Sequence, residues 1–435
     1  MTGDVTVTGF GVRTAFGAGA DALRRGVFAG VPSFAPTTRF DTGPYRTPMA
    51  GAAPDGADAA EHRALRPALA HCGREALDMA GLPAGTQAAV LLGIAGDCTG
   101  ITRFWREAAA EPGAGAGASA GAGSGSGSGS GRADLSGGTG PAVSRSSAAP
   151  AHGNGEGGTV AQLADAVPAH LAESLARSLG LTGPRLTFTN ACVASAAAII
   201  HACRLISSGR ADVAVCAGGY LVEEETFGKF DSGRALSRDG LVRPFSADRT
   251  GLLLGDGVAA VVLESAEHAR RRGARPLAGV TGWGAATDAH HIAQPHPEGV
   301  GLARAARQAL RLAGDPDGAA LGYVNAHGTG TKYNDGAETR GLRAALGDRA
   351  ESIPVSSTKS TTGHLLEAAG VVEFVITVLA LMDGVLPPTA NLTRPDPECD
   401  LDYVPNRPRQ ADVRRALTIN AAFGGANTAL VLERP

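Results

Sequence analysis

The stretch Leu186-Thr-Phe-Thr-Asn-Ala-Cys192-Val-Ala-Ser-Ala-Ala-Ala-Ile-Ile-His-Ala202 decides the fold of this chain. Its first residues predict a short strand, and the alanine-rich, largely apolar remainder predicts a buried helix running to about Gly209. Cys192 stands where the strand turns into the first turn of that helix. Unpaired N–H groups and the helix dipole favour a thiolate there. We therefore expect a nucleophilic cysteine whose pKa lies below the usual value of about 8.5.

Short β-rich runs alternate with helical stretches along the rest of the chain, a pattern typical of α/β proteins. The predicted strands are 5–8, 88–92, 186–189, 213–216, 258–263, 321–325, 417–419 and 428–432. The predicted helices are 59–80, 160–179, 193–208, 301–313, 338–345 and 364–382.

A four-residue motif near the start of the chain recurs in its second part. Thr8-Gly-Phe-Gly11 is echoed by Thr281-Gly-Trp-Gly284, and each motif follows a valine and precedes a series of strands and helices. If the match is real, the chain consists of two similar halves, 1–270 and 271–435. The active site should then lie where the halves meet.

The composition of the chain limits the classes of protein to which it can belong. The 435 residues are 43% hydrophobic, which supports a sizeable core, and the net charge of −3 argues against binding to nucleic acid or to an anionic membrane. None of the six cysteines forms a C-x-x-C pair, so we expect no metal site. The N-terminus lacks the pattern of a signal peptide, and the apolar stretch 371–382 is too short to span a bilayer, so we expect a cytoplasmic protein.

Glycine, alanine and serine dominate residues 111–158. Such a tract buries too little apolar surface to offset the entropy lost on ordering. We interpret it as a flexible surface insertion without a catalytic duty.

Two later segments supply possible partners for Cys192. His327 follows a predicted strand and begins a Gly/Thr loop, where Thr329 and Thr331 could hydrogen-bond a polar chain such as a pantetheine amide. His364 starts the predicted apolar helix, whose N-terminus would keep the imidazole neutral. His327, taken alone, could equally be a structural residue.

Lys359 lies five residues before His364 and, near a low-dielectric site, needs a carboxylate partner. Asp335 or Glu338 could supply it. In isolation Lys359 could also be an ordinary surface charge.

The segment Asn420-Ala-Ala-Phe423-Gly-Gly-Ala-Asn427 lies between two predicted strands. Paired glycines after an aromatic residue suit a tight turn with exposed backbone N–H groups. Such a turn could donate to an oxyanion, although a plain hairpin is the simpler interpretation.

Taken in order, these segments resemble the β-ketoacyl synthases, elongating ketosynthases of the thiolase superfamily from type II fatty-acid or polyketide synthases. The resemblance also covers the opening Val5-Thr-Val-Thr-Gly-Phe-Gly-Val and the segment Arg243-Pro-Phe-Ser-Ala-Asp-Arg-Thr-Gly-Leu-Leu-Leu-Gly-Asp-Gly. It implies an α/β thiolase fold, in which two βαβαβαββ halves form a five-layer αβαβα sandwich that is usually dimeric.

The resemblance also implies roles for individual residues. Cys192 would accept the acyl group, while His327 and His364 would assist decarboxylation of a malonyl thioester. Lys359 with Glu338 would fix the hydrogen bonds of the site. The reaction would be a decarboxylative Claisen condensation with malonyl on an acyl carrier protein. No bound cofactor or metal is implied, because the carrier protein brings the phosphopantetheine.

Further implied features concern the pocket and its partners. Backbone N–H groups of Cys192 and Phe423 would form the oxyanion hole, and Phe423 resembles the gating phenylalanine of the family. Ala421 stands where the family often has a second phenylalanine, so we expect a larger acyl pocket and specialised, polyketide metabolism. The partner would be a second copy or a subunit resembling a chain-length factor. Carrier-protein docking would use basic side chains: Arg63, Arg66, Arg234, Arg238 and Arg243.

Two other functions remain open on these residues. A thiolase-fold acyltransferase would pass the acyl group on without condensation, but the presence of both histidines and Lys359 argues against it. A non-catalytic chain-length partner typically lacks the nucleophile, and Cys192 argues against that role.

Overall fold

Two antiparallel strands, β1 (Val5–Thr14) and β9 (Ala278–Thr287), lie at the centre of one large sheet. The computed structural model describes residues 5–53, 64–102 and 163–435, so the predicted insertion at 111–158 and Arg63 lie outside the described residues. Outward from β1 follow β8 (Gly257–Ser265), β7 (Val213–Tyr220), β5 (Ala89–Gly93) and β6 (Arg185–Phe188). Outward from β9 follow β15 (Ala426–Glu433), β14 (Arg415–Ala421), β10 (Leu321–Asn325) and β11 (Val355–Ser356).

The two arms of this sheet have the same pattern of strand directions. Counted from the centre, the β1 arm has two antiparallel steps followed by two parallel steps. The β9 arm repeats that order. The two arms therefore share one strand topology, and the chain passes from one arm to the other between α8 (Ala266–Arg271) and β9.

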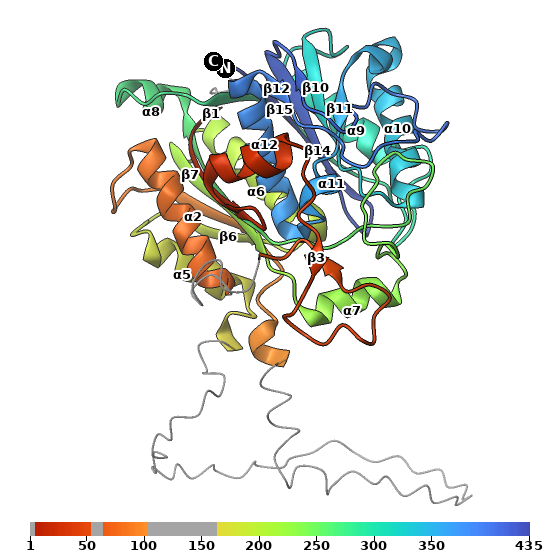
Figure 1. Ribbon diagram of the computed structural model, residues 1–435. Helices are drawn as coiled ribbons and strands as arrows, with labels where there is room; N and C mark the ends of the chain where they lie inside the picture. Colours follow the sequence, from red (N-terminus) through yellow and green to blue (C-terminus); the bar gives the residue numbers. More distant parts are fainter. Residues whose placement is uncertain (1–4, 54–63, 103–162) are drawn as a thin grey trace, which may run out of the picture.

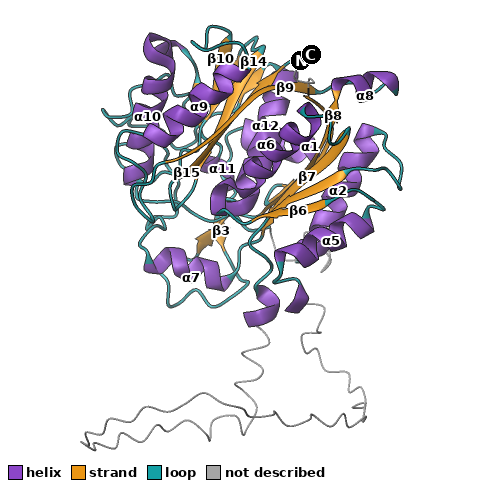
Figure 2. Cartoon of the chain, turned by 180° about the vertical axis from the view of Figure 1, so that it is seen from behind, coloured by secondary structure: helices purple, strands orange, loops and turns teal. Residues whose placement is uncertain are grey.

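Helices cover both faces of each arm and produce five layers. Helices α2 (Leu65–Ala80) and α5 (Pro168–Ser178) pack on the outer face of the β1 arm, and α9 (Val300–Leu312) with α10 (Lys332–Leu346) covers the β9 arm. Helices α6 (Ala194–Ser207) and α12 (Ala369–Asp383) lie between the two arms (Figures 1 and 2). Strand residues alternate between the inner and the outer cores, as the two-residue period of a strand requires.

The repeated motif is explained by how closely two helices approach the sheet. At each of its four glycines a Cβ atom would lie 2.0–2.2 Å from a helix carbonyl oxygen, far inside van der Waals contact. The pairs are Gly9 with Ala76, Gly11 with Cys72, Gly282 with Ala309, and Gly284 with Ala305. In both halves the central strand therefore needs glycine two residues apart, facing carbonyls one helical turn apart.

The first and the last described strands meet the same neighbour. Val280 in β9 pairs with Val5 of β1 on one side and with Leu432 of β15 on the other. The two ends of the chain accordingly lie together in Figure 1.

The predicted elements are largely present, although several differ in extent and some, such as α7 (Glu224–Ser232), were not predicted. Strand β9 was not predicted, α10 begins at Lys332 instead of Glu338, and α12 begins at Ala369 instead of His364.

No helix among the described residues is long and apolar enough to cross a membrane. The shorter elements are β2 (Gly17–Ala18), α1 (Gly19–Leu23), a π-helix (Arg24–Phe28), β3 (Ala35–Pro36), β4 (Met49–Ala50), α7 (Glu224–Ser232), α11 (Lys359–Thr362), β12 (Val385–Leu386), β13 (Arg409–Gln410) and the 3-10 helices η3 (Ala191–Val193), η4 (Gly347–Ser352) and η5 (Leu366–Ala368).

Candidate active site

Cys192 lies in a tight turn between β6 and α6. Ala191, the residue before it, has a φ of 53°, a left-handed conformation that is uncommon for alanine. Helix α12 fixes the helix that follows this turn. Ser195 Oγ in α6 accepts a hydrogen bond of 3.0 Å from Val371 N in α12. Cys192 is 6% exposed and lines the cavity described below. The cysteine is thus fixed at the meeting point of the two halves.

Burial has the largest effect on the pKa of the Cys192 thiol. Removal from water raises the pKa of Cys192 to about 12, and the charge of Glu367 adds to that increase. The favourable effects of Lys359 and of the local backbone hydrogen bond are smaller. The expectation of a lowered pKa is therefore wrong, and the thiol form predominates at neutral pH.

His364 faces Cys192 directly. Its Nε2 atom lies 3.1 Å from Cys192 Sγ, and its backbone is fixed by hydrogen bonds with Leu253 O (2.7 Å) and Gly255 N (3.1 Å). These bonds hold His364 in an extended connection, so α12 begins only at Ala369. The helix N-terminus therefore does not account for its protonation state. Burial, aided by the charge of Lys359, lowers the pKa of His364 well below its usual range.

His327 stands beside His364 at the end of β10. The two rings are 5.3 Å apart and nearly perpendicular, at 85°. Burial is also the main cause that lowers the pKa of His327, followed by the charges of Lys359 and His364. Both imidazoles are therefore neutral at physiological pH, and the described residues provide no partner for either Nδ1 atom.

Glu338 holds the backbone of the His327 loop. Its carboxylate accepts hydrogen bonds from His327 N (2.6 Å) and Gly328 N (2.7 Å). Asp335, one turn earlier in α10, accepts from Thr329 N (3.1 Å). Thr329 and Thr331 lie 2.8 Å apart at their hydroxyl oxygens, and both line the pocket.

The sequence suggested that Lys359 pairs with Glu338 or Asp335, but it pairs with neither. Its ammonium group forms a buried ion pair with Glu373 of α12, which also accepts a hydrogen bond of 2.6 Å from Asn420 Nδ2. The later start of α12 places Glu373 in the second turn of that helix, where it reaches Lys359. Glu338 is engaged by backbone N–H groups instead.

The Phe423 turn forms another wall of the pocket. Gly424 and Gly425 have φ values of 83° and 80°, which glycine adopts without strain. Gly424 N donates to Ile292 O at 2.7 Å, while Phe423 stacks on Phe230 of α7 with ring centroids 5.8 Å apart. Among the described residues, Phe423 N has no backbone acceptor within this turn.

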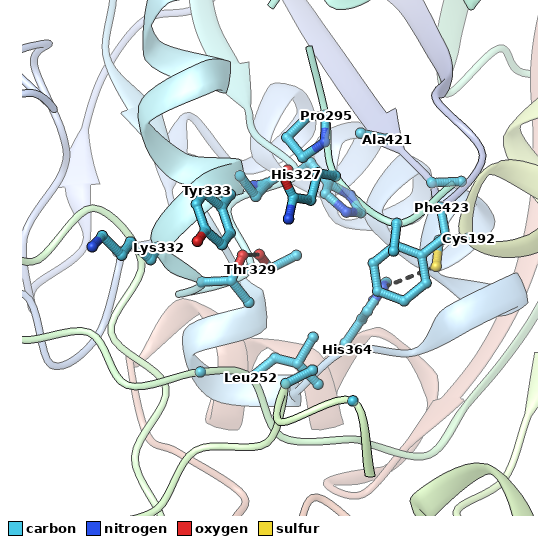
Figure 3. Close-up of a pocket in the computed structure, with 18 of the residues that line it drawn as sticks. Cys192, Leu252, Pro295, His327, Thr329, Lys332, Tyr333, His364, Ala421 and Phe423 are labelled. Carbon is cyan, nitrogen blue, oxygen red and sulfur yellow. Dashed lines mark hydrogen bonds between the residues drawn. The ribbon is translucent and has the colours of Figure 1, made fainter. Parts of the chain in front are cut away.

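These side chains surround a single cavity of about 340 Å³. Figure 3 shows Cys192, His364 and Phe423 at one end and Lys332 at the other, with His327, Thr329 and Tyr333 between them. Ala421 also lines it, as expected for a residue near the acyl pocket. The arrangement offers a thiol, two neutral imidazoles and a channel that reaches the surface.

The basic residues predicted for docking are scattered. Arg234 lines the cavity, Arg243 pairs with Asp239 at 2.6 Å, and Arg66 pairs with Asp165 at 2.8 Å and does not line the cavity. Arg238 is exposed. Sequence analysis missed Glu373, Asn420, Phe230, Lys332 and Tyr333. For the last two, their place directly after Thr331 was the available signal.

Comparisons with known proteins agree along the whole chain. Residues 2–269 match the beta-ketoacyl synthase N-terminal domain, and residues 277–393 match the C-terminal domain. The ketoacyl synthase alpha subunit of tetracenomycin polyketide synthase from Streptomyces glaucescens is 36% identical over 99% of this chain and 97% of its own length. A 3-oxoacyl-[acyl-carrier-protein] synthase 2 from Synechocystis is 43% identical, over 61% of this chain and 65% of that protein.

Solved structures extend the likeness to the fold. The ishigamide ketosynthase/chain length factor has a TM-score of 0.82 at 30% identity and covers both chains completely. A beta-ketoacyl synthase from Burkholderia phymatum has the same TM-score at 27% identity, also over both full chains. Two adjoining domain matches and a full-length relative leave one conclusion: the chain belongs to the beta-ketoacyl synthase family.

Proposed function

We propose that this β-ketoacyl synthase loads an acyl group onto Cys192 Sγ and condenses it with malonyl carried by an acyl carrier protein, in polyketide metabolism. The observation that carries the residue assignment is the 3.1 Å distance from His364 Nε2 to Cys192 Sγ, with His327 beside them in the same cavity. The named polyketide relative from Streptomyces supports the type of pathway.

Acyl loading begins with a protonated thiol. Because the pKa of Cys192 is about 12, attack on the incoming thioester requires proton removal, and neutral His364 accepts that proton at Nε2. Sγ forms a bond to the acyl carbon, the carbon–sulfur bond to the carrier breaks, and the proton passes to the departing thiol. Backbone N–H groups of Cys192 and Phe423 stabilise the oxyanion that forms between these steps.

After loading, His364 exchanges its Nδ1 proton with water for one on Nε2, so that both neutral imidazoles act as donors in condensation. His327 and His364 donate hydrogen bonds to the carbonyl oxygen of the malonyl thioester, the bond to its carboxylate breaks, and carbon dioxide leaves. The resulting enolate attacks the acyl carbon on Cys192, forms the new carbon–carbon bond and displaces the thiolate. The thiolate then takes a proton from water, so each cycle consumes one proton.

Lys359 does not line the cavity but acts on decarboxylation and condensation through its charge. Its buried positive charge lowers the pKa of both histidines, so they stay neutral donors, and the same charge favours a developing enolate. Glu373 and Asn420 hold the ammonium group in place through one hydrogen-bonded chain. Lys359 is thus a positioning and electrostatic residue rather than a proton carrier.

The partners follow from the same proposal. The carrier protein brings the phosphopantetheine arm, and the synthase itself holds no cofactor. The name of the ishigamide structure and the alpha-subunit name of the Streptomyces relative support a second subunit resembling a chain-length factor, with a homodimer as the alternative. The mass of the native complex, with and without that subunit, distinguishes the two. A cytoplasmic location stays a prediction.

Intact-mass measurement tests the proposal. Incubation with acyl carrier protein should add one acyl mass to the wild-type chain and none to Cys192→Ala. Subsequent addition of malonyl carrier protein should remove that mass and release the extended β-keto product. An adduct of equal yield in Cys192→Ala would overturn the assignment, whereas an adduct that never condenses would favour the acyltransferase reading.

A further inference from the structure

Large apolar side chains remain exposed along the cavity. Tyr333, next to Lys332, is 60% exposed and lines the cavity, and Phe423, which lines it at the Cys192 end, is 52% exposed. Ile292 is 81% exposed, directly precedes the cavity-lining Ala293, and bonds through its carbonyl to the Phe423 turn. Large apolar side chains that remain exposed beside a functional cavity are typical of a protein–protein contact.

One of the few lysines of the chain lies at the mouth of the same cavity. The sequence contains only three lysines: Lys229, Lys332 and Lys359. Lys359 is buried against Glu373, and Lys229 pairs with Glu225. Lys332 is exposed at the cavity mouth, and its ammonium group has no carboxylate partner among the described residues. It is therefore a lysine free to pair with another molecule.

Neighbouring charges strengthen a local positive field. Arg234 is exposed on the same rim and, within the described part of the chain, has no carboxylate within ion-pair distance. Arg249 also lines the cavity, but its guanidinium group is engaged by Asp396 and by backbone carbonyls. The mouth thus carries free cations although the chain as a whole has a net charge of −3.

The position of Lys332 is fixed by its backbone. Lys332 O and Thr331 O both accept hydrogen bonds from the Arg249 guanidinium group, at 3.2 Å each. Arg249 is held in turn by its ion pair with Asp396. The first turn of α10 is therefore presented as a rigid surface, which reduces the entropy lost when a partner binds.

We propose that Lys332, Tyr333 and Ile292 form the docking surface for the carrier protein, with Lys332 making the principal ion pair. This inference rests on the proposed function, because the carrier protein must bring its arm to this mouth. The partner is an acidic protein whose carboxylates face Lys332 and Arg234, and its apolar surface packs on Ile292 and Tyr333. Complementary charge around an apolar centre accelerates encounter and fixes orientation.

Kinetics with two malonyl donors test the surface. The donors are malonyl carrier protein and malonyl pantetheine, which offers the same thioester without the protein. In Lys332→Glu we expect the ratio of the two KM values, carrier over pantetheine, to rise about tenfold, and in Lys332→Gln about threefold. Ile292→Ser should raise the ratio too, without the loss of salt dependence that both Lys332 variants show. An unchanged ratio in Lys332→Glu and Ile292→Ser would overturn the proposal.

Cross-linking gives an independent readout that does not depend on turnover. A carbodiimide joins amines to carboxylates that are in contact, and Lys229 serves as the internal control because it is the other exposed lysine. We expect the cross-linked peptide to contain Lys332. Cross-links only at Lys229 would contradict the docking surface.

Two further outcomes separate this inference from the proposed function. If wild-type enzyme makes no condensation product but cross-links at Lys332, the function fails and the surface stands. If Lys332→Glu changes the native oligomeric mass instead of the KM ratio, the surface binds a second subunit and the docking proposal is wrong.

Discussion

Cys192, the proposed nucleophile, is buried in the folded chain. A helix N-terminus favours a thiolate, but that effect is limited to the unpaired N–H groups of the first turn. Removal from water has the largest effect on the pKa of Cys192 and raises it. The sequence revealed the turn and the helix but not how thoroughly other segments cover them. Glu367, which adds to the shift, lies 175 residues away from Cys192 and acts only through the fold.

Glu367→Gln should make Cys192 more reactive. Loss of the nearby negative charge lowers the pKa of the thiol, so a larger fraction is thiolate at any given pH below it. We expect iodoacetamide to alkylate Cys192 about threefold faster at pH 8.5, which corresponds to a decrease of half a pKa unit. Peptide-resolved mass spectrometry gives the rate. Glu225→Gln, on exposed α7, is the matched control, and an equal gain in both variants would argue against a local effect.

Cys192→Gln should separate decarboxylation from condensation. The variant cannot carry an acyl group, but His327, His364 and Lys359 remain in place to stabilise the enolate. We expect release of carbon dioxide from malonyl carrier protein without a condensed product, measured with a carboxyl-labelled malonyl group. Adding His364→Ala should abolish that release, and decarboxylation that survives the second substitution would remove His364 from the step.

Sequence analysis identified residues that the fold brings together at one cavity but paired one of them, Lys359, wrongly. Cys192, His327 and His364 belong to short, distinctive segments, so their convergence was predictable. The partner of Lys359 was not, because Glu373 comes within reach only when α12 begins at Ala369. That start depends on backbone hydrogen bonds between His364 and the distant residues Leu253 and Gly255, for which the local sequence carries no signal.

At the scale of elements, glycine sets how closely helices approach the central strands. Strand β9 was missed because glycine and alanine give a weak strand signal, yet the glycines are what the packing requires. The same contact between strand and helix carbonyls occurs once in each half. The faint repeat in the sequence therefore reflects the same packing requirement in β1 and in β9.

Substitutions within β9 test this requirement. In Gly282→Ala the new Cβ would lie 2.0 Å from Ala309 O, and backbone on both sides cannot yield easily. We expect the free energy of unfolding to fall by about 3 kcal/mol, the upper end of overpacking effects. Gly279→Ala is the control in the same strand, since its Cβ would find no atom closer than 3.8 Å. Urea unfolding measures both, and similar losses would show that the close approach is unimportant.

At the scale of the whole molecule, the buried histidines make stability depend on pH. Burial lowers the pKa of His364 in the folded state, so below about pH 6.5 only the unfolded chain takes up that proton. The folded state is therefore fully stable in this respect above pH 6.5 and loses stability as the pH falls. For one such group the loss is about 1.4 kcal/mol per pH unit.

His364→Ala should remove this dependence. Between pH 7.5 and 5.5, we expect the free energy of unfolding of the wild type to fall by about 1.4 kcal/mol more than that of the variant. Denaturant unfolding at the two pH values gives the difference. His290→Ala, which removes an exposed imidazole, is the control. A constant difference between wild type and His364→Ala would mean that the buried ring accepts a proton in the folded state.

Strands β1 and β15 flank β9 at Val280, which places Val5 and Leu432 about two strand spacings apart, close to 10 Å. A linker of a few residues spans that gap. New ends opened between Arg275 and Pro276, both exposed, would then place the second half before the first. Because every strand would keep its neighbours, such a circular permutant should unfold in one cooperative transition and retain condensation. The order in which the two halves are translated would then be incidental to the enzyme that they build.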